Sequence, residues 1–461
     1  MKALLFPLSL AAAILSLAVN PVLAQTRTIR IATYNIEADI NGATSPLPGL
    51  IAPPTATTSY QSGGVLEGIG EELRNGHAQP LDVLALQETT SNPQTITPIV
   101  TALNTFYGIP GMYTNSTYQG TESGGDVADG NGPNALVFNT LTLQLVASTP
   151  VDPPGGTGYL GSSSGEYREV MRYELAPAGV TVTSSNSFYV YVSHYKSGTS
   201  SADLTDRTGD AKIIRNNEAT ALPAAARVIY VGDYNISSSS EASYTTILAA
   251  TAPDGIAQGA GIDPMNPTDQ TINWAVSTTS TNILAMETEE DYDLRYRDDL
   301  QVMTTNVYDS APGGFAYVSG TYHVFGNNGT VAYEGSVNNA NNTALNNRLV
   351  TNGPVFIPAS QLLLDLTDAS DHLPVVSDYT VPLPVPAINS VSAAGPNLVV
   401  TLSNCATNAV LTLLTATNLT SSGNTWTPVA TNTAAAGSVA FTATNAVNAS
   451  QPCAFFIIQE Q

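Results

Sequence analysis

The sequence predicts a layered α/β protein with mixed sheets, followed by a small all-β sandwich domain. Apolar strand-like runs recur along residues 26–380, and helical patterns separate some of them. The composition then changes after a proline-rich stretch. Because the order is neither a regular βαβ alternation nor strands alone, sheets covered by helices are the class that fits the first region.

Each expected element follows from a local pattern. Helices are expected over 63–75 and 208–222, each before a strand. Residues 41–64 and 305–360 are rich in Pro, Thr, Gly and Asn, so we expect long surface excursions there. The expected strands are TIRIATYNI (28–36), LDVLALQE (81–88), NALVFNT (134–140), SFYVYVSHY (187–195), RVIYVGDYN (227–235), LQVMTTNV (300–307) and LPVVSDY (373–379).

A proline-rich linker is expected at 381–388, and residues 389–461 have a different composition. They contain no Lys, Arg, His or Asp, and Glu460 is their only acid. Short apolar segments separated by Asn, Gly and Ser predict a small β-sandwich. Because this domain lacks acid–base groups, we interpret it as a module that binds a cell surface or a polysaccharide.

The N-terminus predicts export. Lys2 precedes an apolar run, and small residues before Gln25 suit cleavage after Ala24, which makes 1–24 a signal peptide. The alternative is a membrane anchor, but the uninterrupted apolar stretch is short for a span. We therefore expect an exported monomer without stable membrane insertion, in the periplasm, on the cell surface or secreted.

Two bulk features limit the function further. The chain contains two cysteines, Cys405 and Cys453, which in an oxidising compartment predict one disulfide; two buried thiols are the alternative. The formal net charge of −23 argues against a protein that grips polyanions through a broad basic surface. It is compatible with an enzyme whose acidic centre is neutralised by a metal.

Polar residues recur where the expected strands end. Strand ends that carry acids or histidines can hold a site rigidly at the rim of a sheet, and five such ends in one chain favour a shared site. These residues are Asn35 and Glu37, then Glu88, then His194, Lys196 and Ser197, then Asp233 and Asn235; Ser370, Asp371 and His372 lie at the start of the last strand.

The ordered motifs ATYNIE, LALQET, VSHYKSG, VGDYNIS, YRDDLQVMT and SDHLPV resemble the endonuclease/exonuclease/phosphatase superfamily, which includes deoxyribonuclease I. The resemblance covers about residues 29–379. It implies a four-layer α/β sandwich, in which two packed sheets are flanked by helices. It also implies hydrolysis of phosphate esters that depends on a divalent metal, Mg²⁺ first and Mn²⁺ or Ca²⁺ next.

The resemblance also implies roles at matching positions. Glu88 matches the principal metal ligand, which Asn35 and Asp371 complete or buttress. His372 matches the general base that takes a proton from water, and Asp299 matches its partner. Asp233 and Asn235 match residues that hold the nucleophile or the phosphate. His194 matches the histidine that stabilises the transition state or protonates the leaving group, and Arg168 matches an arginine for substrate phosphate.

Several alternatives stay open. Asp299 could instead pair with Arg297, and Asp298 could be the partner of His372. Lys196 could contact the phosphate or form a turn. No partner acid for His194 can be named, and His77 and His323 match nothing, so we expect both at the surface.

From this resemblance we expect the substrate to be a phosphodiester, with extracellular nucleic acid first. A lipid head group, as in sphingomyelinases, or a phosphomonoester is the alternative within the same chemistry. A non-catalytic surface binding protein is the alternative of another class.

Overall fold

The fold is that of a computed structural model of the chain. The structure describes residues 26–38, 49–51, 64–90, 92–116, 133–151, 170–266, 273–275, 281–288, 293–310, 314–346, 357–383, 386–405, 409–416, 426–435, 437–445 and 455–460. They form two compact units, divided between Pro382 and Leu383. The predicted signal peptide, residues 1–24, lies outside the described residues.

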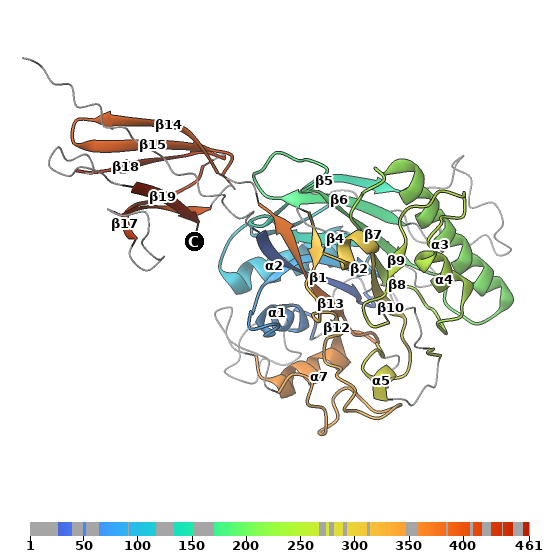
Figure 1. Cartoon of the computed structure of the whole chain (residues 1–461). Helices are drawn as coiled ribbons and strands as arrows, with labels where there is room; N and C mark the ends of the chain where they lie inside the picture. The colour runs from blue at the N-terminus through green and yellow to red at the C-terminus, as the bar shows by residue number, and fades with distance from the viewer. Residues whose placement is uncertain are drawn as a thin grey trace, which may run out of the picture. The chain divides into compact units, whose positions relative to one another are not determined.

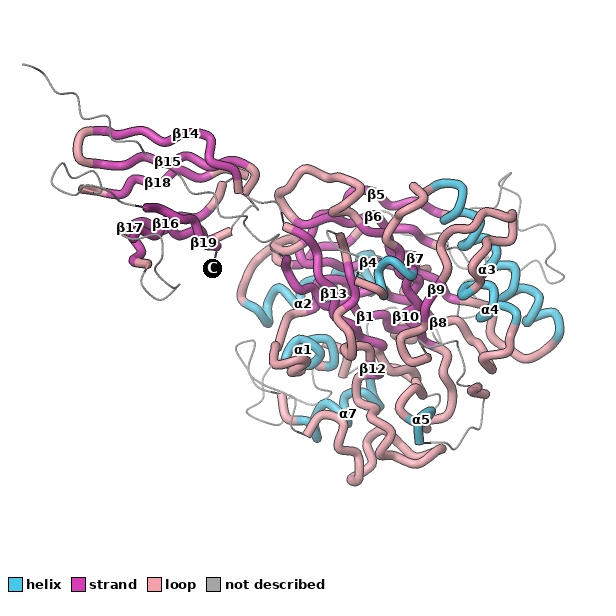
Figure 2. Tube along the Cα trace, viewed as in Figure 1, coloured by secondary structure: helices cyan, strands magenta, loops and turns pink. Residues whose placement is uncertain are grey.

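The larger unit contains two sheets (Figures 1 and 2). In the first, β1 lies between β13, which is antiparallel to it, and β2, which is parallel to it. The order is β11-β13-β1-β2-β4-β3, and β12 also pairs with β13. Its strands are β1 (Thr26–Asn35), β2 (Leu81–Gln87), β3 (Tyr113–Asn115), β4 (Ala135–Asn139), β11 (Ala316–Tyr317), β12 (His323–Val324) and β13 (Val375–Pro382).

The second sheet has the order β5-β6-β7-β8-β10-β9. Its central strands β7 and β8 are parallel, and β10 pairs antiparallel with β8. The strands are β5 (Leu143–Pro150), β6 (Met171–Pro177), β7 (Phe188–His194), β8 (Val228–Asp233), β9 (Gly261–Ile262) and β10 (Asp299–Thr304).

The two sheets pack face to face, because side chains from both enter one apolar cluster. Ile31 and Val83 of the first sheet share it with Val190, Val231 and Met303 of the second. A buried amide also joins the sheets: Gln301 Nε2 of β10 donates to Ile31 O and Val375 O. The strand ends of the two sheets are therefore held in a fixed relation.

Helices cover the outer faces of both sheets and complete four layers (Figure 1). On the first sheet lie α1 (Val65–Glu71), α2 (Thr97–Tyr107) and α7 (Ala359–Ala369), and on the second lie α3 (Ser201–Ala221) and α4 (Ala242–Leu248). Shorter turns are η2 (Asn92–Ile96), α5 (Thr281–Leu284) and α6 (Thr305–Tyr308). The four-layer α/β sandwich expected from the sequence is confirmed. No described helix is long and apolar enough to cross a membrane.

The expected strands and the two expected helices are all present, but one region was predicted wrongly. Residues 305–360 were expected as a surface excursion, yet their described part contains α6, β11 and β12 and buries Phe315, Phe325 and Val337 in the core. Apolar side chains spaced irregularly among Gly and Asn pack there without a strand or helix period.

His323 was also predicted wrongly as a surface residue; His77 is exposed, as expected. Only 8% of His323 is exposed, and its Nε2 lies 2.6 Å from Glu72 Oε2. Burial alone would raise the pKa of Glu72, but His323, Arg74 and Arg30 together lower it to about 2. A strand of two residues has no alternation that would reveal this burial in the sequence.

The smaller unit is an all-β sandwich of two three-stranded sheets, as predicted. Their orders are β14-β15-β18 and β17-β16-β19, and their inner faces bury Val400, Leu411 and Phe441. The strands are β14 (Ala387–Ala394), β15 (Asn397–Ser403), β16 (Val410–Ala416), β17 (Thr427–Thr433), β18 (Val439–Ala443) and β19 (Phe455–Glu460).

The linker and the disulfide are the remaining expectations for this region. The linker is shorter than 381–388, because β13 includes residues 381 and 382 and β14 begins at Ala387. Cys405 is buried, while Cys453 lies outside the described residues, so the disulfide stays a prediction.

Candidate active site

Strand register brings three of the predicted site residues into one row across the second sheet. His194 at the end of β7 pairs with Asp233 at the end of β8, and Asp233 pairs in turn with Asp299 at the start of β10. Gly232 permits the close pairing of β7 with β8, because a Cβ on it would collide with the carbonyl oxygen of Ser193. The row is therefore built by β-pairing itself.

The first sheet supplies the opposite side of the site. Asn35 ends β1, and Glu88 follows directly after β2, which is parallel to β1. His372 precedes β13, whose Val375 pairs with Thr33, so the start of β13 lies beside the end of β1. The Ser370 hydroxyl ties these ends together, because it donates to Asn35 O at 2.7 Å and accepts from His372 N at 3.1 Å.

Three non-glycine residues at these strand ends adopt the left-handed backbone conformation. Their φ angles are 49° at Glu37, 52° at Glu88 and 48° at Asn235. This region is sterically unfavourable for a residue with a Cβ, and such conformations often occur at functional sites. The turns aim polar side chains across the rim: Asn35 Oδ1 accepts from Glu37 N, and Asp233 Oδ1 accepts from Asn235 N.

His372 and Asp299 form a hydrogen-bonded dyad. His372 Nδ1 lies 2.7 Å from Asp299 Oδ2, and 7% of His372 is exposed. Its other nitrogen, Nε2, lies 3.8 Å from Asp233 Oδ2 and 3.8 Å from Asp371 Oδ1. Burial alone would lower the pKa of His372, but the charges of Asp299 and Asp233 outweigh it and raise this pKa well above its usual value.

Asp299 is thus the residue beside His372, and Arg297 pairs with another acid. Arg297 makes a bidentate ion pair with Asp263, at 2.7 and 2.9 Å, instead of pairing with Asp299. The backbone carbonyl of Asp298 accepts from Tyr234 N. The register of YRDDLQ is therefore the one that the sequence motif predicts.

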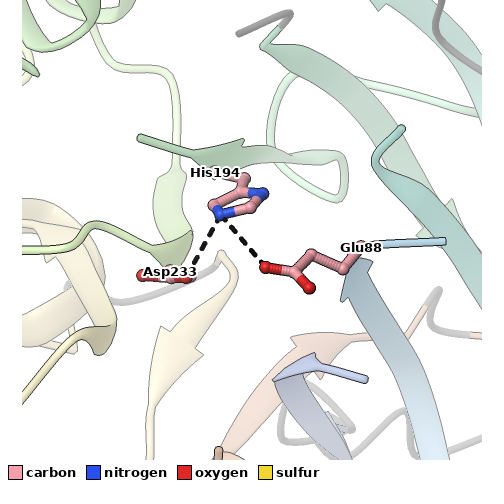
Figure 3. Close-up of side chains that lie close together, drawn as sticks. All are labelled: Glu88, His194 and Asp233. Carbon is pink, nitrogen blue, oxygen red and sulfur yellow. Dashed lines mark ion pairs between the residues drawn. The ribbon is translucent and has the colours of Figure 1, made fainter. Parts of the chain in front are cut away.

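His194 lies between two carboxylates (Figure 3). Its Nε2 is 3.3 Å from Asp233 Oδ2 and 3.5 Å from Glu88 Oε1. Asn35 Nδ2 donates to the same two carboxylates, at 2.9 Å to Glu88 and 3.1 Å to Asp233. Among the described residues, Glu88, His194 and Asp233 are the acids and histidine that could together hold a metal ion.

The donors of this cluster fit a divalent cation. Its three ligand atoms lie within 4.8 Å of one another, and the Glu88 side chain is 13% exposed, so the cluster opens to solvent. Two carboxylates suit Mg²⁺, and an added imidazole is also acceptable to Mn²⁺. A cation would offset the repulsion between the carboxylates, which Asn35 and His194 moderate.

Asn35 and Asp371, which were also predicted as metal ligands, contact different parts of the site. The Asn35 amide nitrogen faces both carboxylates, and its Oδ1 faces Glu37 N, so Asn35 orients the acids of the cluster. Asp371 Oδ1 approaches Nε2 of His372, and the backbone N of Asp371 donates to Glu37 Oε2 at 3.2 Å. Asp371 is therefore on the His372 side of the site.

Comparison with solved structures finds similar chains that cover between 76% and 94% of this chain. One is the human Nocturnin catalytic domain with bound sulfate, at 15% identity and a TM-score of 0.38, covering 77% of this chain and 97% of that one. Another is an endonuclease/exonuclease/phosphatase from Beutenbergia cavernae, at 12% identity and a TM-score of 0.39, covering 94% and 100%. A third is D. rerio TDP2 complexed with a single-strand DNA product, at 12% identity and 0.38, covering 76% and 98%.

These neighbours include endonuclease/exonuclease/phosphatase proteins. No family model and no curated protein matches the chain. With identities of 15% or less and TM-scores below 0.5, the neighbours assign no activity to it. The chemistry of the site therefore has to come from its own residues.

The predicted phosphate contacts are only partly described. Arg168 lies outside the described residues. Lys196 is half-buried beyond the end of β7, in a loop whose carbonyls at Lys196 and Gly198 accept from the buried Arg207. Asn235 is half-buried and donates from Nδ2 to Tyr195 O at 3.1 Å, so it joins the turns that follow β7 and β8.

Sequence reasoning noted Glu37 and Ser370 at strand ends but gave neither a role. In the structure both connect the end of β1 to the segment that carries Asp371 and His372. Their position beside other polar residues was the available signal. What they contact depends on the pairing of β1 with β13, which lie 340 or more residues apart and cannot be paired from sequence alone.

Proposed function

We propose that this protein is an exported, divalent-metal-dependent phosphoesterase that hydrolyses phosphodiesters. The observation that carries the proposal is the His372–Asp299 dyad beside the cluster of Glu88, Asp233 and His194. A cation beside Asp233 would offset part of the negative charge that raises the pKa of His372, and the imidazole held by Asp299 is then suited to accept a proton from water. The adjacent carboxylates of Glu88 and Asp233 are suited to bind such a cation. The ordered motifs of the endonuclease/exonuclease/phosphatase type support the same assignment.

Each residue then has a defined task. Asp299 accepts a hydrogen bond from the Nδ1–H of His372. This leaves Nε2 as the atom that removes the proton from the attacking water. Asp233 and Asp371, each 3.8 Å from Nε2, stabilise the imidazolium that results. Asn235 and Asn35 fix the turns and carboxylates around this point. A bound divalent cation would neutralise charge on the phosphate oxygens.

His194 is placed to act on the phosphate or the leaving oxygen, whereas His372 acts on the attacking water. Its Nε2 is held between Glu88 and Asp233 on the side of the site away from Asp299. If the cation is held by Glu88 and Asp233 and not by His194, a protonated His194 imidazole would stabilise negative charge on the phosphate or donate its proton to the leaving oxygen. Mg²⁺ is the first metal to test, with Mn²⁺ and Ca²⁺ beside it.

Nucleic acid is the first substrate to test. The negative charge of the chain is the reason to test smaller phosphate esters and lipid head groups as the alternative. A net charge of −23 disfavours extended contact with a polyanion and favours a lipid head group or a small phosphate ester. The C-terminal sandwich, which lacks acid–base groups, is proposed to bind a cell surface or polysaccharide. The exported protein is proposed to be monomeric.

A substrate panel tests the proposal. Supercoiled plasmid, single-stranded RNA, sphingomyelin vesicles, bis(p-nitrophenyl) phosphate and p-nitrophenyl phosphate are each incubated with the protein and Mg²⁺, Mn²⁺ or Ca²⁺. We expect turnover that disappears with chelator and returns when the metal is restored. Turnover of the lipid or the monoester without plasmid nicking would move the substrate assignment to the alternative. No turnover of any of these substrates would contradict the proposal.

A further inference from the structure

Thr288 is a buried threonine whose hydroxyl makes three contacts around the segment that carries Asp299. Oγ1 accepts from Asp298 N at 3.1 Å and from Asp299 N at 3.3 Å, and it donates to Tyr296 O at 3.4 Å. A hydroxyl offers one donor and two acceptor sites, so all three are used. The hydroxyl thereby fixes the backbone at the point where β10 begins.

The backbone of Thr288 contacts the other half of the dyad. Its carbonyl oxygen accepts from Leu373 N at 2.7 Å, and Leu373 is the residue that follows His372. Its own N–H donates to Tyr296 O at 2.6 Å, which closes a second bond to the chain leading into β10. One residue, 0% exposed, therefore contacts both segments that carry the dyad.

We infer that Thr288 is a positioning residue that sets the geometry between His372 and Asp299. This inference rests on the proposed function, because the dyad matters for catalysis only if His372 acts as the base. His372 and Asp299 lie 73 residues apart in the chain and on different sheets, so β-pairing does not fix their separation. The contacts of Thr288 join the two segments directly.

A purely structural role is the competing explanation, and Thr304 provides the matched control. Thr304 lies at the opposite end of β10, is 4% exposed, and its Oγ1 likewise accepts a backbone N–H, from Val228 at 3.2 Å. Both residues thus lose a buried hydroxyl acceptor when replaced by valine. Only Thr288 contacts the dyad, so a loss of turnover confined to Thr288→Val separates positioning from general stability.

The first test measures kcat and KM for bis(p-nitrophenyl) phosphate in Thr288→Val, Thr288→Ser and Thr304→Val. We expect Thr288→Val to lower kcat about 10- to 100-fold, with KM changed less than about twofold, because a small misplacement of reacting groups costs turnover more than binding. Thr288→Ser, which keeps the hydroxyl, should restore kcat, and Thr304→Val should retain it. An unchanged kcat in Thr288→Val, or equal losses in both valine variants, would overturn the inference.

A second readout is independent of activity. The chain has four histidines, so protein labelled with ¹⁵N-histidine gives few imidazole signals, and His372→Asn identifies those of His372. We expect a downfield Nδ1 proton in wild type and Thr288→Ser, and its shift or loss in Thr288→Val. If that signal is unchanged, the inference is wrong even where the enzyme is active; if the signal changes while wild type is inactive, only the proposed function fails. Thr288→Ala replaces Thr288→Val if the latter does not fold.

Discussion

His372 Nδ1 lies 2.7 Å from Asp299 Oδ2, although Asp299 begins β10 of the second sheet and His372 precedes β13 of the first. The contact exists because the end of β1, the start of β13 and the start of β10 meet at one rim. The Gln301 amide, two residues after Asp299, donates to Val375 O three residues after His372 and holds the two sheets together below the dyad. The scaffold therefore fixes the imidazole on one side before any substrate binds.

Asp299→Asn tests what the carboxylate contributes. Asparagine can still accept a hydrogen bond from His372 Nδ1, but it no longer stabilises the imidazolium by charge. We expect kcat to fall at least about 100-fold, in the range that a general base contributes. Steady-state kinetics on bis(p-nitrophenyl) phosphate measures the change. The control is Asp309→Asn, at an exposed aspartate beyond α6, and equal kcat in both variants would count against the dyad.

Glu88→Gln tests the metal cluster. Removal of one carboxylate should weaken Mn²⁺ binding by at least about 10-fold, because Glu88 is one of only two carboxylates in the cluster of Glu88, His194 and Asp233. The metal-free Glu88→Gln variant should be at least as stable as the metal-free wild type, since the carboxylates of Glu88 and Asp233 repel each other. Titration calorimetry gives the affinity, and thermal unfolding with and without Mn²⁺ gives the stability. A wild-type Tm that Mn²⁺ does not raise would remove the cluster from consideration as a metal site.

Glu67→Gln tests a pH dependence outside the site. Burial raises the pKa of Glu67 to about 8, while Gly64 N donates to its Oε2 at 2.8 Å. Between the unfolded value of 4.5 and about 8, the folded state keeps a proton that the unfolded state releases, so the free energy of unfolding falls as pH rises. Glutamine keeps the acceptor without the charge.

The expected result is therefore a flatter decline of stability from pH 5 to 8 in Glu67→Gln than in wild type. Some decline should remain, because burial also raises the pKa of Glu71 to about 7. Urea denaturation at each pH measures it, with Glu334→Gln, at an exposed glutamate, as the control. A slope identical to that of wild type would show that Glu67 is ionised in the folded protein.

Asp378→Ala tests the buried ion pair under the first sheet. Arg30 Nε lies 2.8 Å from Asp378 Oδ1, and Arg30 Nη1 also donates to Ile69 O and Glu72 O at the end of α1. Removal of Asp378 leaves a buried guanidinium without its counter-ion, which costs about 3–5 kcal/mol. Urea denaturation should show this loss, while Lys212→Ala at an exposed position should change little. A loss below about 1 kcal/mol would contradict the assigned role.

Much of the site could be predicted from sequence because the strands that carry it are long apolar runs. Such runs fix where a strand ends, and residues such as Glu88, His194 and Asp233 are found directly at those ends. Which strands are neighbours is decided by packing between distant segments. For that reason the acids beside His194, and the contacts of Glu37 and Ser370, emerge only from the structure.

For other residues, the surrounding sequence contains no pattern that predicts their burial or their contacts. Thr288 lies in an irregular segment with no repeat of apolar residues, and its importance depends on four residues whose backbone groups folding brings to it. His323 follows a Gly- and Pro-containing stretch that reads as a loop, and its burial depends on Glu72 at the end of α1. In α7, by contrast, Leu362, Leu363 and Leu366 carry a helical period, although no helix was predicted over these residues.

The most direct test of the central claim is metal-dependent phosphodiester cleavage by His372→Ala beside His77→Ala. His77 is an exposed histidine, so its variant controls for the substitution itself. Plasmid nicking or bis(p-nitrophenyl) phosphate turnover is measured with Mg²⁺ or Mn²⁺, whichever supports the wild type, and with chelator. The account predicts that chelator and His372→Ala each abolish cleavage, while His77→Ala cleaves as wild type does. Cleavage that survives in His372→Ala would contradict the assignment of His372 as the base.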